Sequence, residues 1–432
     1  MSGRKKYSEK KSNEKPSARI VFSAEASGGR VSSETSDIPI TSESKTQWAE
    51  RLRYFEAEQD ALLRTIREFV EIESPSDDKP ALDRICRFLA DRFEAFGGRP
   101  RIHHADDVGN SVQIDFPGRD PGREAGSEKL KPVLLLGHFD TVYPLGTLAN
   151  MPCHVADGRM HGPGVLDMKS GIALMLFAIE ALQSWHSGLP RPVTVFLVSD
   201  EEVGSYSSRK ITEALARESA AVLVLEPAGP RGAVKTARKG VGEYTLTVRG
   251  VAAHAGLDPG KGHSAILELA RQIAAISKWN NLKQGISVNP GVISGGTRTN
   301  VIAAEATVDF DVRITHAKQA AGLDRKFRSL RPFDKKCKLN IEGAINRLPM
   351  ERNAGVAALY KKAQAIAKQI GWKLEEAAVG GGSDGNFTAG IGIPTLDGMG
   401  GHGQGAHAVH EHIVISELPR RGLLLAGMIE SA

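Results

Sequence analysis

The 432-residue sequence has little cysteine, and its three cysteines, Cys86, Cys153 and Cys337, lie far apart. An odd and widely spaced set indicates neither a disulfide framework nor a metal site built from paired cysteines. We interpret Cys153 as a packing residue, because nothing near it suggests a nucleophile. A reducing compartment fits this pattern best, so we expect a cytoplasmic protein.

The sequence also lacks long apolar runs and a strong charge of one sign. No run approaches the length that crosses a membrane, and the polar N-terminus lacks the apolar core of a secretory signal. The formal net charge is only +5. A nucleic-acid-binding protein would present a basic face with aromatic partners on a folded module, and none is recognisable. We therefore expect neither nucleic acid nor a membrane as a partner.

The first part of the chain combines a polar segment with helical patterns. Residues 1–46 are rich in Ser, Glu and Lys, a composition that cannot bury enough surface to fold alone, so we predict a disordered tail. Apolar residues then recur at helical spacing over 48–70 and again over 85–96. Two amphipathic helices are expected there.

Three near-continuous runs of Val and Leu, at 133–136, 193–198 and 222–225, suit strands of a sheet that is covered on both faces. A helix is expected from about Lys169 to Leu182, which gives the strand, loop and helix order of an α/β fold. After about Lys235 the order becomes strand, helix, strand, strand, helix, strand. We predict an inserted α+β module at 237–345 between two parts of a catalytic domain, 47–236 and 346–432.

Acidic and histidine side chains stand where the three buried strands should end. They are His138 and Asp140 after the first strand, Glu201 and Glu202 after the second, and Glu226 after the third. Ligands bind outside the carboxyl ends of strands in open α/β sheets. With Asp167, in the glycine-rich segment 162–167, and His407 near the end of the chain, these oxygen and nitrogen donors suit zinc. The sequence therefore predicts a metal-dependent hydrolase.

Four motifs carry a family resemblance. In chain order they are Gly137-His138-Phe139-Asp140-Thr141-Val142, the segment 162–171, Ser199-Asp200-Glu201-Glu202-Val203-Gly204-Ser205 and Gly380-Gly381-Gly382-Ser383-Asp384. From about Trp48 to its end, the chain resembles metallopeptidase family 20, which includes aminoacylases, deacylases, dipeptidases and glutamate carboxypeptidases. The segment 138–144 looks closest to the bacterial glutamate carboxypeptidase branch.

The resemblance implies a zinc-exopeptidase-like catalytic domain with an inserted dimerisation or lid domain, and two Zn²⁺ per subunit, with Co²⁺ or Mn²⁺ possible in their place. The implied ligands are His138 and Glu226 for one zinc, Glu202 and His407 for the other, and Asp167 as a bridge between both. Asp140 would accept the proton of the second ring nitrogen of His138. Glu201 resembles the general base that moves a proton from water to the leaving amine. Since adjacent strand positions point opposite ways, Glu201 and Glu202 can serve different tasks.

The resemblance also implies a homodimer in which His254 reaches the scissile carbonyl across the interface. Asn300 and Arg313 match positions near the substrate, and Arg313 could hold a free carboxylate with two hydrogen bonds. Gly382 is the expected substrate-binding residue of the fourth motif. His254 could instead be a dimer-packing histidine, and Arg313 a strand-surface arginine.

Some alternatives stay open. His402, His410 and His412 compete with His407, which we prefer because Glu411 follows it at the family's His-x-x-x-Glu spacing. Glu226 precedes Pro227, which is also normal turn sequence. The glycine-rich string 400–405 is not expected to be a nucleotide loop, because it is not part of a strand-to-helix unit with an acidic residue downstream.

The expected function is zinc-dependent hydrolysis of an amide bond in a small peptide or N-acyl amino acid, most simply by a carboxypeptidase of the glutamate carboxypeptidase type. An N-acyl amino acid deacylase, such as an acetylornithine or succinyl-diaminopimelate deacylase, is the alternative enzyme. A catalytically silent protein that binds an amino-acid derivative, or a scaffold, is the alternative of another class, and an intact Glu201 argues against it.

Overall fold

The computed structural model describes residues 45–119 and 130–432. The tail predicted at 1–46 lies outside these residues except for its last two, which begin the first helix. Within the described ranges, no helix is long and apolar enough to cross a membrane. The three cysteines are buried and free.

A six-stranded sheet forms the centre of the catalytic part, with strand order β1-β2-β6-β3-β7-β14. Its strands are β1 (Arg99–His103), β2 (Ser111–Phe116), β3 (Val133–His138), β6 (Val193–Val198), β7 (Ala221–Val224) and β14 (Thr395–Leu396). Strands β6, β3, β7 and β14 are mutually parallel, whereas β2 pairs antiparallel with β6, and β1 pairs antiparallel with β2 at the edge. The carboxyl ends of β3, β6 and β7 therefore meet at the same edge, as the sequence predicts.

Both faces of this sheet are covered, which explains the continuous apolar runs. Leu135 of β3 packs into the larger core, whereas its neighbours Leu134 and Leu136 pack into a smaller core on the opposite face. Helices α3 (Lys79–Glu94), α4 (Ser170–His186), α8 (Ala354–Gln369) and α10 (Leu418–Ser431) contribute to the larger core. Helix α5 (Arg209–Glu218) covers the smaller one, beside α9 (Gly385–Gly390).

The expectation of two amphipathic helices before the first motif is wrong, because there are three. The pattern at 48–70 covers both α1 (Lys45–Ala57) and α2 (Gln59–Val70), which are separated at Glu58. Phe55 and Leu62 on either side of this break are both buried. Helical spacing continues through the break, so the apolar pattern does not reveal it.

Two smaller sheets lie near the C-terminal segment. One has the order β15-β16-β5-β4, from β4 (His154–Ala156), β5 (Arg159–His161), β15 (Gly403–Gln404) and β16 (His412–Val414). The other pairs β8 (Val234–Arg238) in parallel with β13 (Glu376–Val379). The glycine-rich string 400–405 is thus partly β-strand and does not lead directly into a helix, in agreement with its rejection as a nucleotide loop.

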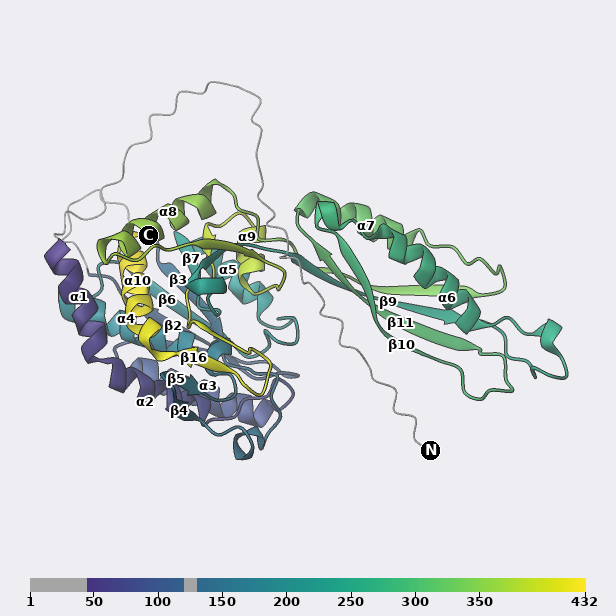
Figure 1. Cartoon of the computed structure of the whole chain (residues 1–432), viewed down its shortest axis with the longest axis horizontal. Coiled ribbons are helices and arrows are strands. Elements are labelled where there is room, and N and C mark those ends of the chain that lie inside the picture. Colours follow the sequence, from purple (N-terminus) through teal and green to yellow (C-terminus); the bar gives the residue numbers. More distant parts are fainter. Residues whose placement is uncertain (1–44, 120–129) are drawn as a thin grey trace, which may run out of the picture. The chain divides into compact units, whose positions relative to one another are not determined.

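The inserted module has its own antiparallel sheet and its own core. Its strands are β9 (Gly240–Arg249), β10 (Ser287–Gly295), β11 (Glu305–Ile314) and β12 (Lys338–Arg347), in the order β10-β11-β9-β12. Helices α6 (Ala265–Ile276) and α7 (Ala320–Arg328) lie on one face of this sheet (Figure 1). Tyr244 stacks on Phe327 of α7 in the core, with ring centroids 3.9 Å apart. The element order agrees with the prediction; the boundaries at 237 and 345 stay predictions.

Candidate metal centre

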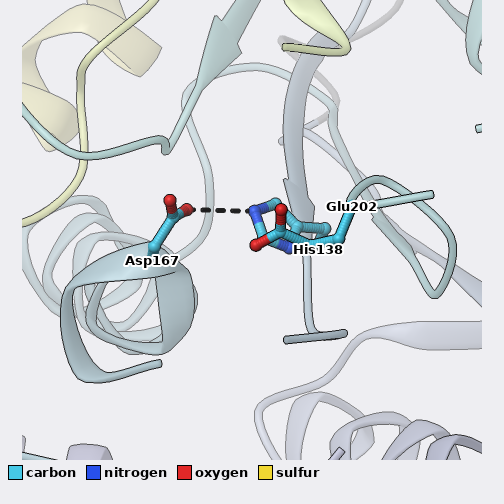
Figure 2. A group of neighbouring side chains, drawn as sticks. All are labelled: His138, Asp167 and Glu202. Carbon is cyan, nitrogen blue, oxygen red and sulfur yellow. Dashed lines mark hydrogen bonds and ion pairs between the residues drawn. The ribbon is translucent and has the colours of Figure 1, made fainter. Parts of the chain in front are cut away.

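His138, the last residue of β3, lies at the centre of the candidate site and its side chain is only 2% exposed. Its Nε2 atom is 3.2 Å from Oδ1 of Asp167 and 3.5 Å from Oε1 of Glu226. Glu202 lies beside them, and Figure 2 shows the imidazole facing the Asp167 carboxylate. Among the residues that the structure describes, two groups of side chains have ligand atoms close enough together to hold a metal ion. Both include His138, one with Asp167 and Glu202 and the other with Glu201 and Glu226.

Asp167 lies in an irregular turn, Val165–Lys169, between β5 and α4. Gly164 before the turn has φ +70°, and a side chain there would collide with Thr141, which explains a glycine at this position. The buried carboxylate of Glu411 accepts hydrogen bonds from the backbone nitrogens of Gly164, Leu166 and Asp167, at 3.0, 2.7 and 3.0 Å. Glu411 thus fixes the turn that carries Asp167.

Glu201 and Glu202 lie in a turn after β6 rather than in the strand itself, so strand alternation does not separate them, and each has an oxygen near His138. Oε1 of Glu202 is 3.0 Å from Nε2 of His407, whereas Oε1 of Glu201 accepts a hydrogen bond of 3.0 Å from Arg347. The two carboxylates therefore have different partners, which permits different roles.

Asp140 differs from its expected geometry. The Nδ1 atom of His138 lies 3.0 Å from the backbone oxygen of Asp140 and 3.4 Å from its carboxylate. The carboxylate also accepts hydrogen bonds from the backbone nitrogens of Glu201 and Glu202, at 3.2 and 3.1 Å, and from the hydroxyl of Ser76 at 2.8 Å. Asp140 thus faces His138 with both its main-chain oxygen and its carboxylate, and the carboxylate also holds the Glu201–Glu202 turn.

Of the four competing histidines, His407 is the one that contacts other predicted ligands. Its Nε2 atom is 3.0 Å from Glu202 and 3.5 Å from Oδ2 of Asp167. His402 faces Glu417 at 3.8 Å, and the ring of His412 packs against that of His161. This geometry supports the choice of His407 as a ligand, which stays a prediction.

We expect His407→Ala to lower the metal content of the purified protein, measured by elemental analysis, whereas His410→Ala should retain it. The reason is that only the first substitution removes a nitrogen that faces Glu202 and Asp167. Full metal content in His407→Ala, together with a loss in His410→Ala, would show that the wrong histidine was chosen.

The electrostatics of the side chains agree with a cation site. Burial raises the pKa of Glu202, and Asp167 and Glu202 raise the pKa of His407 to about 10. Burial disfavours the charged form of His138, but the neighbouring carboxylates, Asp140 first, outweigh it and raise its pKa well above the usual value. Crowded carboxylates thus attract protons onto the histidines, and a metal ion would replace those protons. Imidazole nitrogens and carboxylate oxygens converging in this way fit Zn²⁺.

Several charged residues at the site were missed by sequence reasoning. Arg238 contacts Glu226 and Asp397, and Arg347 contacts Glu201 and Asp384. Asp384 belongs to the fourth motif, which was a usable signal, whereas neither arginine stands in a recognisable motif.

Lys235 is a further buried cation that the sequence did not disclose. It is 8% exposed, and burial together with Arg238 lowers its pKa, although Asp397, Glu226 and Asp167 oppose this shift. Its ε-amino group has no hydrogen-bond partner among residues 45–119 and 130–432.

The predicted substrate residues of the inserted module do not contact the predicted ligands in the described parts of this single chain. His254 is exposed, and its Nδ1 accepts hydrogen bonds only from the backbone nitrogens of Gly256 and Leu257, both at 3.1 Å. Asn300 is also exposed, and Arg313 is engaged with Asp311 at 2.7 Å. Gly382 directs its carbonyl oxygen to Arg238 at 3.1 Å. The contacts with Asp311 use Nε and Nη2 of Arg313 and leave its Nη1 donors available for a substrate carboxylate.

Comparison with known proteins places these features in a family. The model of "Peptidase family M20/M25/M40" matches residues 134–431. Carboxypeptidase G2 of Pseudomonas sp. (strain RS-16) is 29% identical over 381 residues, which cover 86% of this chain and 89% of that protein. Succinyl-diaminopimelate desuccinylase of Paracidovorax citrulli is 30% identical over 319 residues, covering 68% of this chain and 79% of that protein.

Solved structures share the fold. A tripeptidase from Staphylococcus aureus superposes with a TM-score of 0.70 at 21% identity, covering 86% of this chain and 98% of its own. A Bacillus subtilis protein described as a dinuclear metal-binding peptidase of the M20 family gives a TM-score of 0.61 at 15% identity, with 87% and 98% covered.

The chain belongs to peptidase family M20/M25/M40 and is a metal-dependent hydrolase. The resemblance read from the four motifs, the α/β catalytic fold with an inserted α+β module, and the enzyme class are therefore confirmed.

Proposed function

We propose that this chain is a two-metal exopeptidase of the carboxypeptidase type, which hydrolyses the amide bond beside a carboxylate-bearing amino acid. The observation that carries the proposal is the position of Asp167 between two histidines, 3.2 Å from His138 and 3.5 Å from His407. Glu226 lies 3.5 Å from His138, and Glu202 lies 3.0 Å from His407. Zn²⁺ ions held by His138, Asp167, Glu202, Glu226 and His407 would supply Lewis acidity and lower the pKa of water.

Glu201 would act as the general base in this scheme. Burial raises the pKa of Glu201 well above its usual range, although Arg347 opposes the shift. A carboxylate of raised pKa accepts a proton more readily, and it can return that proton to the departing amine nitrogen. Arg347 holds one oxygen of Glu201 at 3.0 Å, which orients the carboxylate for that transfer.

A carboxylate-bearing substrate is favoured by one buried lysine. Lys235 has no partner for its ε-amino group among the described residues, and charge-assisted hydrogen bonds to a carboxylate are the strong kind. The similarity to carboxypeptidase G2 supports a peptide substrate, and that to succinyl-diaminopimelate desuccinylase keeps a deacylase as the second candidate. We also propose that the metal is Zn²⁺ and that the protein is cytoplasmic.

The deciding experiment is a hydrolysis panel with Zn²⁺, Co²⁺ or Mn²⁺ added to the protein. Dipeptides that end in glutamate, aspartate or alanine test the carboxypeptidase, and N-acetyl and N-succinyl amino acids test the deacylase. Turnover of the second set alone would favour the deacylase. A metal-loaded protein inert on both sets would favour the silent binding or scaffold protein.

We expect Lys235→Met to raise KM for substrates with a free carboxylate by roughly 10- to 100-fold, the effect of losing one charge-assisted hydrogen bond. Substrates whose carboxylate is blocked as an amide should be unaffected, and so should the control Lys361→Met, which removes an exposed lysine of α8. Equal losses on free and blocked substrates would contradict this role of Lys235.

We also propose that the inserted module forms a homodimer. Strand β10 is the edge of its sheet, and it exposes Val292 and Ile293, each 62% accessible. Nearby α6 exposes Ile266 and Leu267, at 44% and 64%. An edge strand and an apolar helix surface can pair with the same elements of a second copy about a two-fold axis. His254 would then serve the partner's substrate, where its ring can stabilise the oxyanion.

A mixed dimer tests this arrangement. We expect His254→Ala and Glu201→Gln chains to be inactive alone and to recover one working site per heterodimer when exchanged, because the intact His254 of one chain would meet the intact Glu201 of the other. Activity is measured after chain exchange has been demonstrated by mass spectrometry. Exchange without recovery would place His254 in its own subunit's site or make it a packing residue.

A further inference from the structure

Arg238, the last residue of β8, is 4% exposed and every donor of its guanidinium is engaged. Its Nε and Nη2 atoms donate to the two oxygens of Asp397, both at 2.7 Å. Nη2 also donates to Oε2 of Glu226 at 3.0 Å. Nη1 donates to the carbonyl oxygens of Gly381 and Gly382, at 3.2 and 3.1 Å. An arginine has five N–H donors, so none is left for a substrate.

These bonds divide the two oxygens of Glu226 between different partners. Oε2 is held by Arg238, whereas Oε1 faces Nε2 of His138 at 3.5 Å. We propose that Arg238 is a positioning residue that restricts Glu226 to metal coordination through one oxygen, and thereby sets the affinity of the metal position that Glu226 and His138 form. This inference rests on the two-metal site proposed above.

Asp397 fixes Arg238 in this position. Asp397 is fully buried, and one of its oxygens also accepts the hydroxyl of Ser383 at 2.6 Å. The negative charge of Asp397 offsets part of the positive charge of the guanidinium. Arg238 can therefore lie close to Glu226 and leave the carboxylate of Glu226 its negative charge. The geometry requires the planar fork of arginine, since the ammonium of lysine cannot serve Asp397, Glu226 and two carbonyl groups together.

The effect is confined to one of the two metal positions. Within the described residues, the side-chain contacts of Glu202 are with His407, and those of Asp167 are with His138 and His407. Arg347 contacts Glu201, the predicted base, rather than a predicted ligand. Among the predicted carboxylate ligands in the described residues, Glu226 is thus the one that an arginine holds. Loss of this arginine should lower the metal affinity of one position and leave the affinity of the other unchanged.

The experiment measures metal binding rather than activity. The full-length protein, freed of metal, is titrated with Zn²⁺ against a competing chelator for wild type, Arg238→Met, Arg238→Lys and the control Arg352→Met. The control removes an arginine that binds Glu376 in the same two-bond manner outside the site, at 2.6 and 3.0 Å. We expect one of the two dissociation constants to rise by roughly 10- to 100-fold in both Arg238 variants, the usual cost of losing a partner of a ligand. The other constant, and both constants of Arg352→Met, should match wild type.

Co²⁺ provides a second readout, because its visible absorption reports coordination number. Release of Oε2 should change the spectrum of the weakened position only. Wild-type affinities in a folded Arg238 variant would overturn the inference, as would equal weakening of both positions. Circular dichroism of the metal-free proteins checks the fold: if Arg238→Met does not fold, Arg238→Lys carries the test, and unfolding of both would assign Arg238 to stability and reject the proposal. A wild-type protein that binds no metal would instead overturn the two-metal site itself.

Discussion

Replacing Glu201 with glutamine should reduce kcat by at least roughly 10²- to 10⁴-fold, the contribution of a general base, while metal content and fold are retained. Glutamine has the shape of glutamate, and its side-chain oxygen can still accept the hydrogen bond that Arg347 donates to Glu201 at 3.0 Å. The amide cannot take up a proton, so only the proton transfer is lost.

The surroundings of Glu201 explain why the fold should tolerate this change. Arg347 also bonds the hydroxyl of Ser205 at 2.8 Å and Asp384 at 3.2 Å, so it keeps partners when the charge of Glu201 is removed. Glu218→Gln is a matched control, because Glu218 is an exposed residue at the end of α5. Steady-state kinetics and elemental analysis of both variants test the role. Near-normal turnover in a metal-loaded Glu201→Gln protein would exclude Glu201 as the base.

The strands that position the site could be predicted because their burial shows directly in the local sequence. Each residue of β3, β6 and β7 is buried, so a near-continuous run of apolar residues is the direct consequence of a sheet covered on both faces. The polar residues at the strand ends followed from the rule that ligands bind at this edge. By contrast, the break between α1 and α2 leaves the apolar spacing unchanged, so the sequence pattern could not reveal it.

The arginines at the site could not be predicted, because their partners are distant in the chain. Arg238 and Asp397 are separated by 159 positions, and Arg347 and Glu201 by 146. A buried arginine is stable only when its donors are satisfied, and that depends on the folded backbone rather than on neighbouring residues. The same argument applies to Asp140, whose carboxylate turned out to hold the backbone of Glu201 and Glu202.

The second large effect is expected for Asp167, whose two oxygens face different histidines. Oδ1 lies 3.2 Å from His138 and Oδ2 lies 3.5 Å from His407. Burial would raise the pKa of Asp167, but these histidines hold it well below its usual range. A carboxylate between the two ligand groups would also reduce the repulsion between two dications held there.

Asp167→Ala should therefore abolish binding at both metal positions and reduce activity to background, whereas His407→Ala removes a ligand from one position only. The turn itself should survive, since Glu411 still accepts the hydrogen bonds of the backbone nitrogens of Leu166 and residue 167. Asp107→Ala, a substitution of an exposed aspartate between β1 and β2, serves as the control. Elemental analysis, with circular dichroism to verify the fold, measures the outcome. A folded Asp167→Ala protein that keeps one metal at full occupancy would show that this carboxylate belongs to a single position, and the bridging role would have to be abandoned.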